Sequence, residues 1–261
     1  NSGKTTAAGY NAGSSLTNDG KENTFYGYEA GKSNTSGEGN VYIGQGAGDG
    51  GETNSYCVGV GRQALSSNTA SHNVAVGTFA LDAATTGVNN VALGNYALTK
   101  NTSGKKNTAC GHHASENNLT GEYTTAVGEQ AARKNTVDRT TAIGAGALTE
   151  TTSGTNNTAV GYMAGSTQST ANHCTLVGDA AFQYGTGDEN TVIGSTASSG
   201  ALTGSNNTII GYDAEQSANN VSNEITLGNS SVATLRCQVT SISSLSDRRD
   251  KTDINTLDLG L

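Results

Sequence analysis

The chain has 261 residues, of which 5% are aromatic and 14% charged, and it contains 36 glycines but no tryptophan or proline. This composition excludes a conventional globular core, and the low charge argues against a disordered chain. The formal net charge of -8 and the 14 scattered lysine and arginine residues leave no basic surface for nucleic acid. We therefore expect a thin, regular core and no nucleic-acid partner.

The sequence shows no signal for a membrane or for a disulfide framework. No apolar run approaches about 18 residues and no charged and then apolar leader begins at Asn1, so we expect neither membrane insertion nor a secretory signal. The cysteines lie 53, 64 and 63 residues apart, which fits neither a metal knuckle nor a disulfide scaffold. We expect free thiols at Cys57, Cys110, Cys174 and Cys237.

A motif centred on glycine recurs every 16 or 17 residues. In residues 90–97, NVALGNYA, an Asn opens a β-branched, small and aliphatic run before the glycine, and an Ala follows the glycine by three places. The alternation before the glycine predicts a short strand. The recurring glycines are Gly27, Gly44, Gly61, Gly77, Gly94, Gly111, Gly128, Gly144, Gly161, Gly178, Gly194, Gly211 and Gly228, and Gly9 begins an earlier copy.

This period predicts an all-β fold, a parallel β-roll or β-solenoid of about 13 to 14 coils over residues 1–231. Two strands of roughly five residues, each followed by a turn of about three, would fill one flattened coil. Helical repeats would need a 3.6-residue period, which the chain lacks. Stacked coils would place like residues side by side, so that the glycines allow close backbone approach and the Asn side chains hydrogen-bond along the stack.

A coil this thin buries little apolar surface of its own. We expect the aliphatic residue before each glycine and the following Ala to fill the interior, and other apolar side chains to remain outside. Some of these should bury against identical chains in a homotrimeric rod. The expected outer residues are Tyr28, Phe79, Tyr96, Tyr162 and Tyr212 after the glycines, and Leu65, Leu81, Leu98 and Leu148 after the alanines.

The repeats resemble those of a known family. NNVALGNYA at 89–97 and NNTAVGYMA at 156–164 are similar to the head repeats of trimeric autotransporter adhesins. The resemblance covers residues 5 to 231. It implies a left-handed parallel β-roll and the packing of three chains around one axis.

A different pattern follows the last repeat. Leu235, Cys237 and Val239 alternate with polar residues, which predicts an extended β neck over 232–245. The next residues, 246–251, read SDRRDK and resemble the start of the intramolecular chaperone domain of phage tail fibres and tailspikes. The sixteen residues 246–261 are far fewer than that domain needs, so we expect only its start here.

The chaperone resemblance implies a single-turnover self-cleavage. In that family a Ser and Lys dyad cuts the chain just before the Ser, once the fibre has trimerised. Carried over, Ser246 would be the nucleophile, Lys251 the base and the bond between Leu245 and Ser246 the scissile one. The base must lose its proton, which requires burial or a neighbouring cation such as Arg248. No other catalysis is expected.

Other clusters admit simpler interpretations. The pair His112-His113 could form a metal site, but exposed repeat positions are the preferred explanation. The pairs Asp188-Glu189 and Asp213-Glu215 could suggest glycosidase carboxylates, although their places in turns favour solvated side chains. The acidic GDGGE at 48–52 occurs once, whereas calcium-binding β-rolls need Asp on successive coils. We expect no metal and no cofactor.

These patterns together favour a structural and adhesive protein. The leading interpretation is the distal part of a bacteriophage tail fibre, a virion and extracellular protein that attaches to a glycan or protein receptor on the host cell. Its partners would be two identical chains and other tail-fibre or baseplate proteins. The alternatives are the head of a bacterial trimeric adhesin and a tailspike that degrades polysaccharide. A uniform rod offers no deep cleft, which argues against the last.

Overall fold

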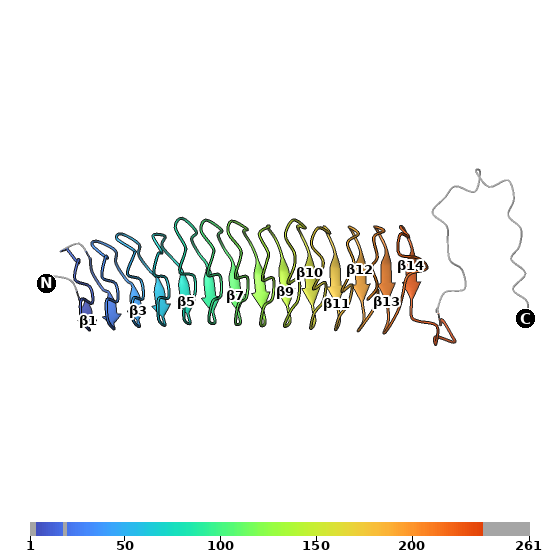
Figure 1. The fold of residues 1–261 in the computed structure, drawn as a ribbon, viewed down its shortest axis with the longest axis horizontal. Coiled ribbons are helices and arrows are strands. Elements are labelled where there is room, and N and C mark those ends of the chain that lie inside the picture. The colour runs from blue at the N-terminus through green and yellow to red at the C-terminus, as the bar shows by residue number, and fades with distance from the viewer. Residues whose placement is uncertain (1–3, 18–19, 237–261) are drawn as a thin grey trace, which may run out of the picture. The chain divides into compact units, whose positions relative to one another are not determined.

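The computed structural model describes residues 4–17 and 20–236 and shows a β-solenoid with no helix among them (Figure 1). Fourteen parallel strands of three residues pair in chain order in a single sheet, which confirms the predicted all-β solenoid. Each coil is named by its strand, so that coil 9 contains β9. The strands are β1 (Thr6–Ala8), β2 (Thr24–Tyr26), β3 (Val41–Ile43), β4 (Val58–Val60), β5 (Val74–Val76), β6 (Val91–Leu93), β7 (Thr108–Cys110), β8 (Thr125–Val127), β9 (Thr141–Ile143), β10 (Thr158–Val160), β11 (Thr175–Val177), β12 (Thr191–Ile193), β13 (Thr208–Ile210) and β14 (Ile225–Leu227).

The register of the sheet places like beside like. Ala92 in β6 pairs with Ala109 in β7, and the residues on either side pair in the same order. The prediction of two strands per coil was wrong, since each coil has one. In the other half of the coil, Tyr96 and Leu98 take φ values of 60° and 50°, which an extended strand cannot accommodate.

Backbone hydrogen bonds still join the coils where the strand is missing. The N–H of Tyr96 donates to the carbonyl of Thr78 in the preceding coil at 3.0 Å. The N–H of Leu98 donates to Ala114 in the following coil at 3.1 Å. The two left-handed residues therefore point their N–H groups along the stack in opposite directions, and the turn half of the coil is as firmly tied to its neighbours as the strand half.

The interior is filled from different positions than the sequence suggested. From β2 to β13 the middle residue of the strand points inward, as Ala92 does, while the aliphatic residue before the glycine lies on the outer face. The alternation of a strand requires this, because residues on either side of an inward one must point out. The four leucines expected outside are fully buried, since the left-handed residue after each Ala turns its side chain into the coil; they are Leu65, Leu81, Leu98 and Leu148.

Large and small side chains alternate within the narrow cross-section. In coils 2 and 3 the strand offers a large residue and the opposite turn offers a glycine: a Cβ at Gly48 would lie 2.5 Å from the ring of Tyr42, and one at Gly31 would lie 2.7 Å from Phe25. Where the strand offers Ala92, the turn supplies Leu98. These coils therefore keep a similar thickness although different residues fill them.

The predicted Asn stack is confirmed. Wherever the Asn recurs, its side chain forms hydrogen bonds to the next coil. The side chain of Asn90 is fully buried; its Oδ1 accepts the N–H of Asn107 at 2.9 Å, and its Nδ2 donates to the carbonyl of Gly104 at 2.9 Å. Both partners belong to the next coil. Cys57 occupies an Asn position, and its N–H donates to Oδ1 of Asn40 at 2.9 Å. Cys57, Cys110 and Cys174 are free thiols.

The glycine stack is the tightest contact between coils. Gly94 has a φ of 135°, and a Cβ built on it would lie 2.5 Å from the carbonyl oxygen of Gly111 in the next coil. Residues with side chains rarely take this φ, and real Cβ atoms do not approach backbone this closely. The strand therefore ends where two backbones touch, which only glycine permits.

The chain divides after Ser230 into two units, and the solenoid is the first. Of the predicted neck at 232–245, residues 232–236 are described and none of them lies in a strand. The rest of the neck, with Cys237, lies outside the described residues.

Candidate functional site

An apolar stripe covers the outer face of the sheet. It consists of the third residue of successive strands, which is aliphatic in all but one coil from β3 to β14. Ile143 is typical, with 39% of its surface exposed. At roughly 4.8 Å per strand the stripe is on the order of 50 Å long. Its residues are Ile43, Val60, Val76, Leu93, Cys110, Val127, Ile143, Val160, Val177, Ile193, Ile210 and Leu227.

The first residue of each strand lies beside this stripe, because first and third positions face the same way, and it widens the apolar surface where it is Val. It is Val in four coils, from β3 to β6, and Thr in the seven from β7 to β13. Monomeric proteins seldom expose one contiguous apolar area of this extent. Cys110 takes the place before Gly111 that is aliphatic in the other coils from β3 to β14, and it lies within the stripe and is partly exposed. The outer face of the sheet therefore has the character of an interface.

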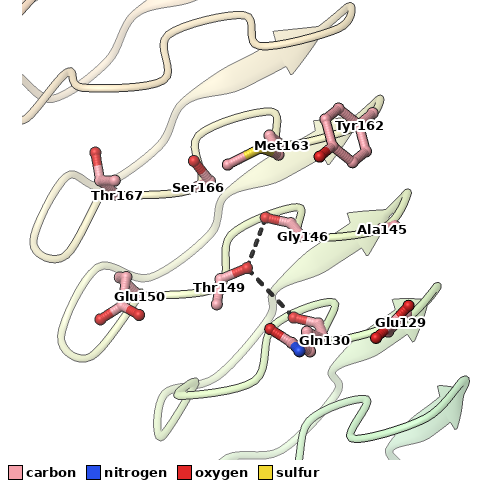
Figure 2. A pocket seen from close by; sticks show the side chains of 10 residues that line it. All are labelled: Glu129, Gln130, Ala145, Gly146, Thr149, Glu150, Tyr162, Met163, Ser166 and Thr167. Carbon is pink, nitrogen blue, oxygen red and sulfur yellow. Dashed lines mark hydrogen bonds between the residues drawn. The ribbon is translucent and has the colours of Figure 1, made fainter.

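A hollow interrupts the turn face over coil 9 (Figure 2). Its volume is about 370 Å³. It exists because coil 9 has Ala145 and Gly146 where the preceding coil has Glu129 and Gln130. The hydroxyl of Thr149 donates to the carbonyl of Gly146 at 2.7 Å on its floor. Its lining residues are Glu129, Gln130, Ala145, Gly146, Thr149, Glu150, Tyr162, Met163, Ser166 and Thr167.

Aromatic rings stack along the same turn face in coils 5 to 7. The ring of Phe79 lies 5.4 Å from that of Tyr96, which lies 5.0 Å from that of His113. The guanidinium of Arg62 stands 5.2 Å from the Phe79 ring, in a cation–π contact. The three rings occupy the second place after successive glycines, so the repeat spacing itself sets the stacking distance.

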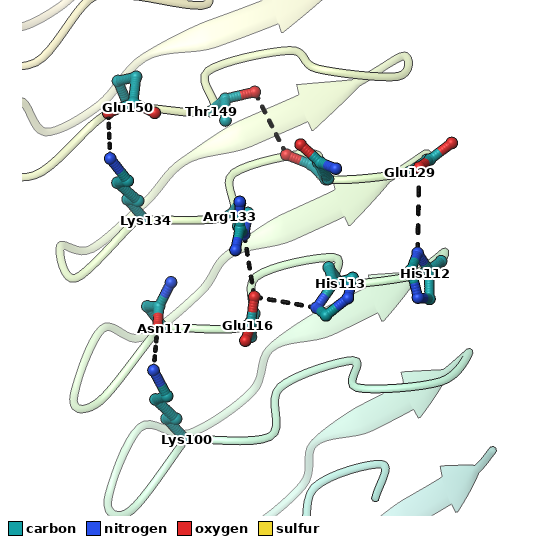
Figure 3. Close-up of polar contacts among 11 residues, drawn as sticks. Lys100, His112, His113, Glu116, Asn117, Glu129, Arg133, Lys134, Thr149 and Glu150 are labelled. Carbon is teal, nitrogen blue, oxygen red and sulfur yellow. Dashed lines mark hydrogen bonds and ion pairs between the residues drawn. The ribbon is translucent and has the colours of Figure 1, made fainter. Parts of the chain in front are cut away.

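Charged side chains lie beside His113 on the same turn face (Figure 3). The Nδ1 atom of His113 and Nε of Arg133 each lie 2.9 Å from Oε2 of Glu116. Burial raises the pKa of Glu116, but the hydrogen bond from Arg133 and the charge of His113 outweigh it and leave the pKa below its usual value. Glu116 is therefore held as a carboxylate between the guanidinium of Arg133 and the imidazole of His113.

The neighbouring histidine is differently placed. Nδ1 of His112 lies 3.9 Å from a carboxylate oxygen of Glu129, and its ring meets that of His113 edge-on at 4.0 Å. Within residues 4–17 and 20–236, no three His, Cys, Asp or Glu side chains gather in a way that could hold a metal ion. Each histidine of the pair therefore has an acid as its neighbour, Glu129 for His112 and Glu116 for His113.

The predicted self-cleavage residues Ser246 and Lys251 lie outside the described residues, as does the Leu245–Ser246 bond. Reasoning from the sequence also missed the stripe, the hollow and the contacts of the His pair with acids. The signal for the stripe was present in the strict alternation of each strand. The signal for the hollow was the pair of small residues in coil 9, Ala145 and Gly146.

No model of a known protein family, no curated protein and no solved structure matches the chain. The described residues include no helix long and apolar enough to span a bilayer.

Proposed function

We propose that the protein is an attachment fibre in which three identical chains join along the apolar stripe into one shaft. The observation that carries this proposal is the continuity of the stripe from β3 to β14. A second copy is the occupant that fits best, because a uniform row of aliphatic side chains on one solenoid is complementary to the same row on another. The number three comes from the resemblance to trimeric adhesin heads.

The shaft holds the turn faces outward, where the side chains differ from coil to coil. Such a surface suits attachment to a glycan or protein receptor on a host cell. Together with the SDRRDK motif after the repeats, this favours the distal part of a phage tail fibre, exposed on the virion and joined to other tail proteins. The self-cleavage roles of Ser246 and Lys251 remain predictions from that motif alone.

Cys110 offers a direct test of the assembly. Equal coils meet when copies are related by an axis parallel to the solenoid, so Cys110 of one chain would face Cys110 of the next. Cys57 and Cys174 are buried, and Cys237 can be replaced by serine. A short bis-maleimide should then link two chains through Cys110, and equilibrium sedimentation should give three times the chain mass of 26.3 kDa.

The matched control moves the thiol to the turn face. In the double variant Cys110→Ser and Tyr162→Cys, the reagent should link no chains, while the mass stays threefold. A monomeric mass, or no linkage at Cys110, would overturn the proposed assembly, and a twofold mass would overturn the trimer. Attachment is tested by saturable binding of the labelled protein to a panel of bacterial strains, and a trimer that binds none contradicts the receptor role.

A further inference from the structure

The hollow over coil 9 is a built feature of the turn face. The coils on either side place Gln130 and Met163 at the second position after the glycine, and both have left-handed φ values, 56° and 52°. Gly146 stands at the same position with a φ of 72°. The backbone therefore accepts a side chain there, and the glycine is not required by the fold. Because Gly146 has no side chain, a space is left open between the side chains of the adjacent coils (Figure 2).

The walls combine an apolar surface with hydrogen-bonding groups. Tyr162 is 60% exposed and forms one wall with Met163, while the carboxylates of Glu129 and Glu150 stand on the opposite side and at the rim. The hydroxyl of Ser166 is buried, with 3% of the residue exposed, and has no hydrogen-bond partner within the described chain. A buried hydroxyl without a partner in the wall of a hollow is a group that a bound molecule can satisfy.

The charge of the hollow selects among ligands. None of its ten lining residues is a cation. Lys134 reaches Glu150 from outside the lining at 2.5 Å, so this cation is already paired with an acid of the rim. An anionic ligand would meet two carboxylates and no free positive partner. A neutral ligand with several hydroxyls would find acceptors in the carboxylates and the amide of Gln130.

We propose that this hollow binds one neutral sugar residue of a cell-surface glycan. A hexose ring presents C–H groups on its face, which suit the Tyr162 ring and the Met163 thioether, and hydroxyls on its edge, which suit the carboxylates and Ser166. A volume of about 370 Å³ accommodates one such ring with room to spare. This inference rests on the proposed function, because it names the receptor chemistry of the turn face.

The test uses the full chain and simple probes. Saturation-transfer NMR is recorded with the methyl glycosides of glucose, galactose, mannose and N-acetylglucosamine, and with methyl glucuronide as the anionic probe. At least one neutral glycoside should receive saturation and the glucuronide none. Gly146→Gln, which gives coil 9 the residue found in coil 8, should weaken binding at least tenfold.

The control fills the same position elsewhere. Ala180 stands second after the glycine of coil 11 with a φ of 51° and lies outside the hollow, so Ala180→Gln should leave glycoside binding unchanged. Equal circular dichroism and threefold mass in both variants would show that the shaft is intact. The proposal is overturned if no neutral glycoside binds, if the glucuronide binds as well as they do, or if Gly146→Gln binds like the unmodified protein.

Cell attachment separates this inference from the fibre function. Attachment that survives Gly146→Gln, or that survives periodate oxidation of the cell-surface glycans, would leave the fibre function standing and reject the sugar site, pointing instead to a protein ligand. Loss of attachment in Gly146→Gln but not in Ala180→Gln would support both. An unmodified trimer that binds a glycoside but no cell would uphold the site and reject the attachment role.

Discussion

The strand side and the turn side of the solenoid differ in how much the residue type at equivalent positions varies from coil to coil. On the strand side the middle residue is Ala in six successive coils. Near the start of the solenoid it is instead Phe25 or Tyr42, and each of these large residues lies opposite a glycine. On the turn side the residue after the glycine is Asn95, His112, Glu129, Ala145 and Tyr162 in five successive coils. Positions that contact the equivalent residue of the next coil are restricted in residue type. The turn positions that face solvent can vary from coil to coil and so can take part in binding other molecules.

The largest effect is expected where two backbones touch. Gly94→Ala places a methyl group 2.5 Å from the carbonyl oxygen of Gly111 at a φ of 135°, so the stack must open there. We expect a loss of about 4 kcal/mol or more in the free energy of unfolding, or no folded protein. Thermal unfolding followed by circular dichroism measures it.

The turn side provides the matched glycine. At Gly146 a new Cβ would lie 3.2 Å from Met163 Cγ and 3.7 Å from Thr149 Oγ1, both in side chains that can move, and 3.8 Å from the backbone Cα of Met163, which is an ordinary van der Waals distance. Gly146→Ala should lower the free energy of unfolding by about 1 to 2 kcal/mol, the cost of a left-handed alanine and well below the loss at Gly94, because neighbouring coils hold larger residues at this position. Equal losses in the two variants would contradict the distinction between the two sides.

Two buried asparagines, one on each side of the solenoid, extend the comparison to hydrogen bonds between side chains and the backbone. Asn90→Ala removes two hydrogen bonds and leaves the Asn107 N–H and the Gly104 carbonyl unpaired in the interior, so we expect a loss of about 3 kcal/mol. Asn101 is equally buried on the turn side, but neither polar atom of its side chain has a partner in the described chain. Asn101→Ala should therefore cost less than about 1 kcal/mol. Denaturant titration of both variants decides this, and a larger loss at Asn101 would refute it.

The sequence predicted those features that repeat with the coil. The spacing of the glycines gave the solenoid, and the recurring Asn gave its buried stack, because a period in the chain becomes contact in space. It could not reveal that Tyr96 and Leu98 would take left-handed φ values, since bulky residues rarely do so alone. In the stack their N–H groups find carbonyls in adjacent coils, and only the three-dimensional arrangement shows that compensation.

The same limit explains the errors over inside and outside. Alternation fixed which strand residues share a face but not which face is buried, and the larger aliphatic residues were assigned to the core. The narrow cross-section instead takes Ala92 inward and leaves Leu93 out. The hollow depends on an exception, the small pair Ala145 and Gly146, which is visible in the sequence but is passed over when only the recurring residues are considered.

A weaker effect than that of Asn90→Ala is expected from an acid at a partly buried position of the turn side. Burial raises the pKa of Asp82 to about 6 from its ordinary 3.8. The folded chain therefore binds this proton more tightly than the unfolded chain, so the contribution of Asp82 to stability is greatest below about pH 4 and falls as the pH rises through 6. At pH 8 the buried charge should cost about 1 to 2 kcal/mol. Asp82→Asn removes that cost.

The variant should consequently melt at a higher temperature than the unmodified protein at pH 8, with the difference shrinking steadily toward pH 4. The solenoid is otherwise unchanged, so the comparison at each pH isolates this one carboxyl from the other acids of the chain. A difference in melting temperature that stays constant between pH 5 and pH 8 would show that Asp82 ionises freely in the folded state. In that case the turn side would be as open to water at its fifth position after the glycine as it is at the first.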